Sequence, residues 1–441
     1  MMPAALVMTA ARLIDGTGCP AITDGAVVVE GERITAVGPR GEVPVPHGAE
    51  TLDLGGCTLL PGFVDAHSHI TINPGLTGII GQLEGLNEPS TRQVLRGARN
   101  LRLDLASGVT TMRIVGEVPY NDVVVRDAIA DGYITGPRLL ISGRAITSSN
   151  GHGSRVPAWI VDGADEMRRV VREQLRMGCD FTKLIVTGRQ YVTNAHEYLG
   201  FTEGEIAAAI DESHRVGKKI GAHLRADLET GLRLCLRLGL DLTDHTFPID
   251  QESIDLYLAA GATAVPTYTI GLQTSVDWEL LRGKTIAERL EHIRALDRQR
   301  LAQREFADRA VGARITWLRE RAAEDFRRSA SAGVPYCLGT DAMHGLFAHE
   351  MEVLTTWGIP AMDAIVAGTH GGARALGVDH ETGSLTAGKV ADVIVVDGDP
   401  LADITALGNI RFVMRAGVRY DPAALLDRPV AEDVSELGRP S

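Results

Sequence analysis

The sequence places residues that bind divalent metals at the ends of several apolar, strand-like segments. His67 and His69 end the stretch PGFVDAHSHI, which covers residues 61–70. Because side chains of a strand alternate between its two faces, these imidazoles share one face while Ser68 points away. Corresponding positions of later strand-like segments carry further polar groups: Lys183, His223, His245 and Asp341. Neutral imidazoles and a carboxylate are typical ligands of a divalent transition metal, so we predict a metal centre.

Each of these residues, taken singly, has an ordinary structural explanation. A histidine at a strand end usually only forms a hydrogen bond, and an aspartate after Gly-Thr usually caps a turn. A lysine on a strand usually extends its amine to solvent. Their joint occurrence on five strand-like segments at corresponding depth favours a common function over coincidence.

Lys183 is the unusual member of the group, because an ammonium ion repels a metal. Burial beside other cations is expected to lower the pKa of its amine and to leave the amine largely neutral. A neutral amine can add carbon dioxide to form a carbamate, which is an anionic ligand with two oxygens. Such a group would bridge two metals about 3.5 to 4 Å apart, the separation usual in two-metal hydrolytic sites.

The segments that carry these residues alternate with amphipathic, helix-like stretches such as ADEMRRVVREQLRMG. Eight strand-like segments with intervening helices predict an α/β fold, a (β/α)8 TIM-like barrel over residues 61–376. In such barrels the working residues sit at the carboxyl ends of the strands. A charged stretch at about residues 280–328 exceeds a normal crossover and predicts a helical insertion.

Both ends of the chain consist of short alternating segments separated by turn signals, such as GAVVVEGERITAVGP. We therefore predict that residues 1–60 and 377–441 together form a small β-sandwich domain.

Composition excludes several classes of partner. The net charge of −13 argues against binding to nucleic acid or anionic lipid, since both require clustered basic residues. No apolar run approaches the roughly 18 to 20 residues that span a bilayer. The five cysteines are scattered without CxxC spacing, which indicates a reducing compartment. We expect a cytoplasmic protein, a homo-oligomer or a monomer, that acts on a small-molecule substrate.

With these motifs in place, the chain resembles the amidohydrolase superfamily over nearly its whole length. The likeness includes ARLIDGTG, LLPGFVDAHSHI, LGTDA and GSLTAGKVADVIVVDGDPL. Within that superfamily, ITSSNGHG followed by GADEMRRVVREQLRMGCDFTKLIVTG is similar to the prolidase-like, imidazolonepropionase-related branch of metal-dependent hydrolases.

The resemblance implies a binuclear centre in which His67, His69 and Asp341 hold one metal and carboxylated Lys183 bridges it to a second. His223 and its neighbour on the next strand, His245, would hold that second metal. A hydroxide bridging the metals would be the nucleophile, and Asp341 would pass its proton to the leaving group. Zinc is the expected metal, and manganese and cobalt suit the same ligands.

Substrate contacts are less strongly indicated by the sequence. His152 matches a histidine that the branch uses on the substrate carbonyl, although a structural histidine in a Gly-rich turn would look the same. Arg225 would clamp a substrate carboxylate or form a structural ion pair. Three further residues are candidates for the pocket: Tyr268, Tyr191 and His344.

The leading functional hypothesis is hydrolysis of the amide bond of a dipeptide or N-acyl amino acid. An aryl-urea or carbamate hydrolase would use the same residues. A deaminase would typically use one metal and no lysine bridge, which Lys183 argues against. A non-catalytic scaffold would tend to lose ligands, whereas all six positions are filled.

Overall fold

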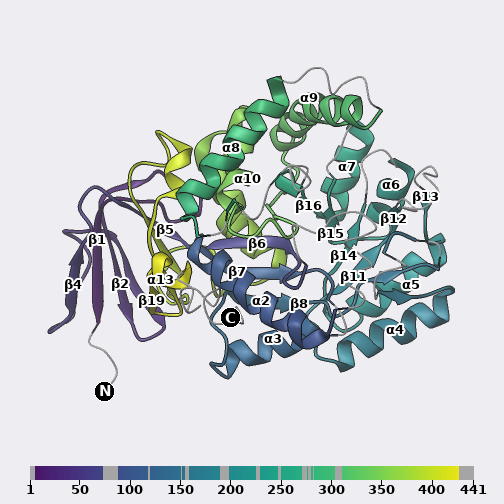
Figure 1. Ribbon diagram of the computed structural model, residues 1–441, viewed down its shortest axis with the longest axis horizontal. Coiled ribbons are helices and arrows are strands. Elements are labelled where there is room, and N and C mark those ends of the chain that lie inside the picture. Colours follow the sequence, from purple (N-terminus) through teal and green to yellow (C-terminus); the bar gives the residue numbers. More distant parts are fainter. Residues whose placement is uncertain are drawn as a thin grey trace, which may run out of the picture.

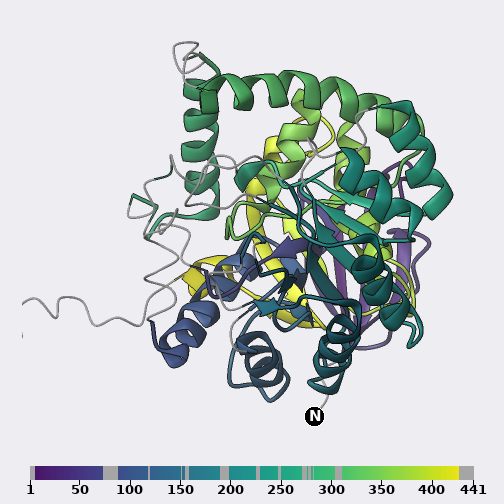
Figure 2. The same ribbon diagram turned by 90° about the vertical axis from the view of Figure 1, so that its right-hand side faces the viewer.

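The structure of the chain is a computed structural model in which helices cover β-sheets, a mixed α/β architecture as predicted (Figures 1 and 2). No helix among the described residues is long and apolar enough to cross a membrane. The structure describes residues 5–72, 88–117, 120–149, 151–153, 158–188, 198–224, 229–246, 250–270, 276, 280–281, 283–302 and 310–426.

The strands of the two chain ends belong to one eight-stranded sheet, at one end of the molecule in Figure 1. Its N-terminal strands are β1 (Leu6–Leu13), β2 (Ile22–Glu30), β3 (Arg33–Pro39), β4 (Glu50–Asp53) and β5 (Thr58–Pro61). Its C-terminal strands are β17 (Val393–Val396), β18 (Ile410–Arg415) and β19 (Val418–Tyr420). The antiparallel pair β5–β17 joins both groups in the order β19-β18-β17-β5-β1-β2-β3, and β4 pairs with β1.

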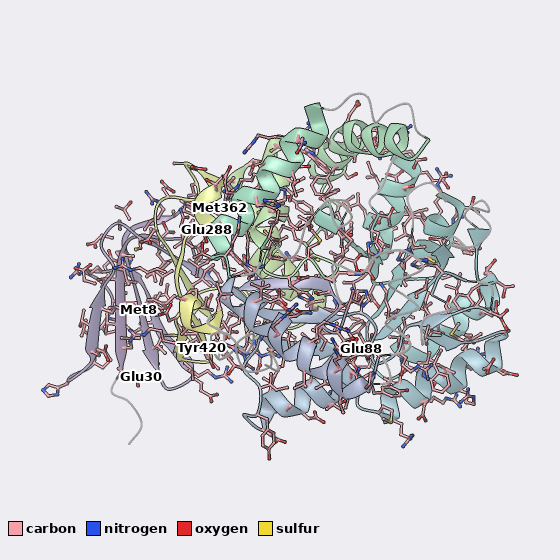
Figure 3. The ribbon with its side chains drawn as sticks, in the orientation of Figure 1. Met8, Glu30, Glu88, Glu288, Met362 and Tyr420 are labelled. Atoms are coloured by element: carbon pink, nitrogen blue, oxygen red, sulfur yellow. The ribbon has the colours of Figure 1, made fainter. Side chains whose placement is uncertain are left out.

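Alternation of side chains explains this sheet. In β2, Val27 and Val29 point to one face and enter a buried cluster with Met8 of β1, which is labelled in Figure 3. Glu30, also labelled there, ends the strand and is exposed. Val395 of β17 belongs to the same cluster, so residues from both ends of the chain share one core. The two-layered sandwich and the exact domain limits stay predictions.

The middle of the chain forms parallel strands. One sheet has the order β6 (Phe63–Ser68), β7 (Val109–Ile114) and β8 (Arg138–Ile141). The other has the order β10 (Trp159–Ile160), β9 (Ile146–Thr147), β11 (Thr182–Ile185), β14 (Ile220–His223), β15 (Leu242–Asp244) and β16 (Thr263–Val265). A two-stranded antiparallel ribbon follows β11 and consists of β12 (Thr187–Gly188) and β13 (Tyr198–Leu199).

An extended segment at residues 334–341 links the two parallel sheets. On one side, Cys337 donates its backbone N–H to the carbonyl of Ala264 in β16, and Tyr336 forms a parallel bridge with Ala264. On the other side, Ala66 of β6 donates to Leu338. The sequence predicts a regular strand here, but the structure has only a single bridge at Tyr336. Pro335, which lacks an N–H, precedes that bridge. This order of strands is the one expected for a (β/α)8 barrel.

Helices cover the parallel strands. They are α2 (Ser90–Ala106), α3 (Asn121–Ala130), α4 (Ala164–Arg176), α5 (Glu203–His214), α6 (Glu229–Arg237), α7 (Gln251–Ala260), α8 (Ile286–Ala302), α9 (Ala310–Ser331), α10 (Phe347–Thr356), α11 (Ala361–Val366), α12 (Gly372–Leu376) and α13 (Pro422–Leu426). Single-turn elements η3 (Ala367–Gly371) and η4 (Ile404–Gly408) complete them. Local sequence explains their ends: Asp250 caps α7 by accepting from the Ser253 N–H, and Gly261 ends it at φ +65°.

The segment predicted as a helical insertion contains α8 and α9, which lie along the upper edge of the molecule (Figures 1 and 2). Ion pairs fasten α8 to α10. Arg294 makes a bidentate contact to Glu352, with nitrogen–oxygen distances of 2.9 and 2.7 Å. His349 Nδ1 lies 3.0 Å from Glu352 Oε2, and its Nε2 lies 3.8 Å from Asp297 Oδ2.

The close approach of residues 334–341 to β6 requires a glycine. A Cβ added to Gly339 would lie 2.5 Å from the Cβ of His67 and 2.8 Å from its backbone nitrogen. We expect Gly339→Ala to lower the free energy of unfolding by about 1–3 kcal/mol in urea titrations, because the backbone must shift. Gly41→Ala is the control, since nothing lies within 4 Å of its added Cβ. Equal stability of both variants would contradict this packing.

The contact between α8 and α10 should depend on pH. The His349 pKa is raised to about 9, because the carboxylates of Asp297 and Glu352 outweigh the opposing effect of burial. A histidine whose pKa is raised on folding contributes stability that is fully present below its unfolded pKa of about 6.5. This contribution is lost as the pH rises through the folded pKa of about 9. The stability difference between the wild type and His349→Gln should therefore fall by about 3 kcal/mol from pH 6 to pH 9.5, measured by urea unfolding. A pH-independent difference would contradict a protonated His349.

Candidate metal centre

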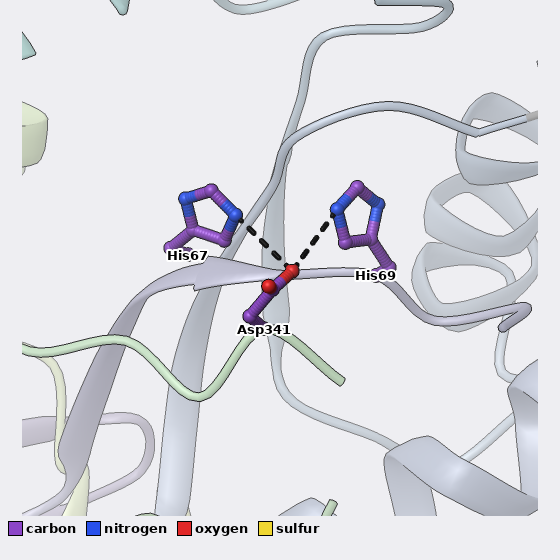
Figure 4. A group of neighbouring side chains, drawn as sticks. All are labelled: His67, His69 and Asp341. Carbon is purple, nitrogen blue, oxygen red and sulfur yellow. Dashed lines mark ion pairs between the residues drawn. The ribbon is translucent and has the colours of Figure 1, made fainter. Parts of the chain in front are cut away.

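Three predicted ligands form a compact group at the end of β6 (Figure 4). His67 Nε2 lies 3.4 Å from Asp341 Oδ1, and His69 Nε2 lies 3.3 Å from the same oxygen. The ligand atoms of the three residues all lie within 4.8 Å of one another. The alternation of β6 places both rings on one side, and the Asp341 N–H bonds to the His67 carbonyl at 2.8 Å.

The donor atoms of this group fit a divalent metal. His69 Nδ1 lies 2.9 Å from the Gly116 carbonyl, which fixes the proton on Nδ1 and leaves Nε2 as a free donor. His67 is 1% exposed, and its Nε2 has no hydrogen-bond partner among the described residues. A buried nitrogen without a partner is costly, and a metal ion at about 2 Å would satisfy it.

The other predicted ligands converge on the same place from three more strands. His245, directly after β15, has its ring centroid 4.5 Å from that of His67. His223, at the end of β14, lies 4.5 Å from His245. Lys183 of β11 is 3% exposed and contacts Asp244. The structure therefore brings all six predicted side chains into one cluster, while their role as metal ligands stays a prediction.

Two residues of the cluster have a strained backbone. His245 has φ +65° and Asp341 has φ +51°, both in the left-handed region that non-glycine residues rarely adopt. Such conformations cost of order 1 kcal/mol or more each, and they occur most often at functional sites. Both side chains are therefore held by the surrounding structure and not by local preference.

Asp244 is a central residue that sequence reasoning missed. It is fully buried, and its Oδ1 lies 2.9 Å from Arg113 Nη1 and 3.0 Å from His67 Nδ1. Its Oδ2 contacts Lys183. Burial alone would raise the Asp244 pKa, but the charges of Arg113 and Lys183 outweigh it and hold that pKa well below its ordinary value. The signal was its position in a strand immediately before a candidate ligand.

The expected depression of the Lys183 pKa is confirmed. Burial lowers it to about 8, and the nearby Asp244 only partly opposes this effect. A pKa of about 8 still leaves most of the amine protonated at pH 7, so the expectation of a largely neutral amine is wrong; the smaller neutral fraction is the form that reacts with carbon dioxide. The carbamate itself stays a prediction.

Buried carboxylates hold the backbone on both sides of the ligands. Asp65 accepts hydrogen bonds from the N–H groups of His67 at 3.0 Å and Thr340 at 3.2 Å. Glu117 accepts from the N–H groups of Ile70 at 2.6 Å and Thr71 at 3.1 Å, directly after His69. These contacts fix the chain where it carries ligands. The sequence offers no pattern that identifies Glu117, because it lies 47 residues from its partner Ile70.

The predicted substrate contacts have different surroundings. The ring of His152 stacks on His223 with centroids 4.8 Å apart and 23° between planes, so it lies beside the cluster. Tyr268 lies in an aromatic group, 4.3 Å from the Trp357 ring centroid. His344 is 1% exposed, and its Nδ1 lies 2.8 Å from Asp104 Oδ2.

The last two contacts are structural, and substrate contacts for Tyr268 and His344 stay predictions. Arg225 and Tyr191 lie outside the described residues.

The charge of Asp244 should be essential for stability. In Asp244→Asn, the buried cations of Arg113 and Lys183 lose their counter-charge, and we expect the free energy of unfolding to fall by about 3–5 kcal/mol. Urea unfolding at pH 7 measures this loss. The control is Asp363→Asn on α11, an exposed site where a change within about 0.5 kcal/mol is expected. A loss below about 1 kcal/mol for Asp244→Asn would show that the buried contacts are not coupled as described.

Comparisons with known proteins agree with this geometry. The profile of the Amidohydrolase family matches residues 58–419. The chain is 26% identical over 432 residues to ochratoxinase of Aspergillus niger, covering 90% of this chain and 82% of that protein. A solved Xaa-Pro dipeptidase with bound methionine in its active site superposes with a TM-score of 0.76 at 25% identity, covering 95% and 100% of the two chains.

The crystal structure of A. niger ochratoxinase superposes with a TM-score of 0.79 at 23% identity, over 96% of this chain and 98% of that one, and supports the fold. The resemblance inferred from the motifs is thus confirmed. The family match extends from β5 to β19 and includes every residue of the cluster. The chain therefore belongs to the Amidohydrolase family, which makes it a hydrolase that acts on carbon–nitrogen bonds.

Proposed function

We propose that this protein is a metal-dependent hydrolase that cleaves the amide bond of a dipeptide or N-acyl amino acid. The observation that carries the proposal is the largely buried group of His67, His69 and Asp341, with His245 beside His67 and His223 beside His245. Amidohydrolases generally use a binuclear metal centre, and this donor set suits zinc, manganese or cobalt. We further propose that the parallel strands form a complete (β/α)8 barrel.

In this proposal, His67, His69 and Asp341 would hold one metal, and His223 and His245 would hold a second. Lys183, as a carbamate, would supply a further oxygen ligand. When bound, divalent metals lower the pKa of water and polarise a carbonyl group. The remaining chemistry depends on where the side chains of this chain can hold or move a proton.

Asp341 is placed to move that proton. Its Oδ1 faces His67 and His69, while its Oδ2 lies on the side of His245, 4.0 Å from that ring's Nδ1. Burial raises the Asp341 pKa, but the nearby imidazoles of His67, His69 and His245 outweigh it and hold that pKa well below its ordinary value, so the group is ionised. An ionised carboxylate with a free oxygen can take a proton from the attacking water and return it to the leaving amine.

His152 would bind the developing oxyanion. Its stacking on His223 keeps the ring at the edge of the cluster, where an N–H donor can meet a substrate carbonyl. Its own carbonyl accepts a hydrogen bond from Thr147 at 2.7 Å, which fixes the loop that carries it. Arg225 would bind the substrate carboxylate.

One observation supports the substrate class and a second supports the type of enzyme. The related dipeptidase structure has an amino acid, methionine, bound in its active site, and it matches this chain over nearly its full length. Lys183 within the cluster favours a two-metal hydrolase over a one-metal deaminase. The same groups would also cleave an aryl urea or a carbamate, so these compounds belong in the same test.

The function is tested with the purified, metal-loaded protein. We expect hydrolysis of dipeptides and N-acyl amino acids, with kcat/KM at least about tenfold above that for the matching methyl esters. Two metals per chain and loss of activity on chelation are expected.

The mass of the intact native protein should show the added carbon dioxide on Lys183. His152→Ala should lower kcat and leave metal content unchanged.

Each alternative has its own result. Faster turnover of aryl ureas or carbamates would replace the substrate class but keep the mechanism. A single metal per chain with ammonia release would support a deaminase. A protein with neither metal nor turnover would be a scaffold, and the proposal would be wrong.

A further inference from the structure

The hydroxyl of Thr267 holds one ring nitrogen of His245. Thr267 lies just after β16, and its Oγ1 is 2.7 Å from His245 Nδ1. The hydroxyl is able to accept the Nδ1 proton, which would leave the lone pair of Nε2 free as a metal donor. The backbone of His245 is in the left-handed region, so this contact supplies an orientation that local preference does not.

The two residues after Thr267 are held by Glu350 of α10. The N–H of Tyr268 lies 3.0 Å from Glu350 Oε2, and that of Thr269 lies 2.8 Å from Oε1. The Thr269 hydroxyl donates to the same carboxylate. Glu350 is fully buried, so its oxygens face these donors without competition from water. One side chain on α10 therefore fixes the backbone that presents Thr267.

Glu350 itself lies in a braced helix. Its neighbours on α10, His349 and Glu352, make the contacts to α8 described above, including the bidentate pair with Arg294. A continuous series of contacts thus leads from α8 through α10 and the loop after β16 to the ring of His245. Each step is a direct contact between described side chains or backbone groups.

The ligands differ in what holds their second nitrogen. A backbone carbonyl, that of Gly116, faces His69 Nδ1, and buried Asp244 lies 3.0 Å from His67 Nδ1. His245 alone among these three relies on a neutral hydroxyl, presented by a loop that Glu350 fixes. The orientation of the His245 ring therefore depends on a single hydroxyl, which a small substitution at Thr267 removes.

We propose that Thr267 and Glu350 are positioning residues for the second metal: Thr267 sets the tautomer and direction of the His245 ring, and Glu350 fixes the backbone of Thr267. This inference rests on the proposed binuclear centre. Partners of this kind typically change metal affinity by about 10- to 100-fold when they are removed.

The test is metal binding by the full-length chain after chelation. Cobalt is titrated into the apoprotein and followed by visible absorption and by metal content after equilibrium dialysis. The wild type is expected to bind two cobalt ions per chain. Thr267→Val, which keeps the shape of the side chain, should weaken one site about 10- to 100-fold and leave the other within about threefold. Thr267→Ser should restore the weakened site.

Two further variants separate positioning from loss of the fold. Glu350→Gln should weaken the same site as Thr267→Val, because it keeps the volume but leaves one acceptor oxygen where the carboxyl group offers two, so that one of the N–H groups of Tyr268 and Thr269 loses its acceptor. Thr356→Val, at the exposed end of α10, removes a hydroxyl bonded only to the Val353 carbonyl and should bind cobalt like the wild type. The melting temperatures of the apoproteins of all three threonine variants should agree with that of the wild type within about 4 °C.

Distinct outcomes separate this inference from the proposed function. Two cobalt ions bound with wild-type affinities by Thr267→Val would overturn the inference alone. Equal weakening of both sites together with a lower apoprotein melting temperature would also overturn it, since the role would be general stability. A wild type that binds a single cobalt ion would overturn both the inference and the binuclear centre.

Discussion

A single buried carboxylate is the interaction on which the site depends. Asp244, at the end of β15, contacts Arg113 of β7, Lys183 of β11 and His67 of β6, which are residues from three other parallel strands. A buried charge without partners is very costly, so Asp244 is tolerated only while these strands keep their places. The same contacts orient the ring of His67 and place the negative charge of Asp244 beside Lys183. Fold and site are in this way parts of one electrostatic arrangement.

Around that centre, buried acidic side chains hold backbone N–H groups. Asp65 and Glu117 hold the residues next to the β6 histidines, Asp104 holds the Gly345 N–H after Asp341, and Glu350 holds the loop after β16. Glu117, Asp104 and Glu350 lie on segments other than those they hold, whereas Asp65 lies on β6 together with His67. Segments that follow the strands are therefore fixed in position, which is what preorganised catalysis requires.

This separation between strands and the segments that follow them explains how enzymes of one family can act on many substrates. The strands and their buried carboxylates fix the candidate metal ligands, whereas the candidate substrate contact His152 comes from a segment after a strand. His152 lies in such a segment and reaches the cluster only by stacking on His223. The membership of the chain in the Amidohydrolase family thus determines the chemistry more closely than it determines the substrate.

The sequence by itself determined the alternation of strands and helices, the positions of the six candidate ligands and the family. These follow from local rules: period two in strands, period 3.6 in helices, and ligand types at strand ends. Asp244, Glu117 and Glu350 were not identified, because a buried acid is recognised only by its partners, and those partners lie far away along the chain. The irregular segment at residues 334–341 was read as a strand, since its apolar pattern is strand-like while its hydrogen bonds depend on neighbours. Tertiary structure alone decided which charges meet, because burial and pairing are properties of packed elements and not of any single segment.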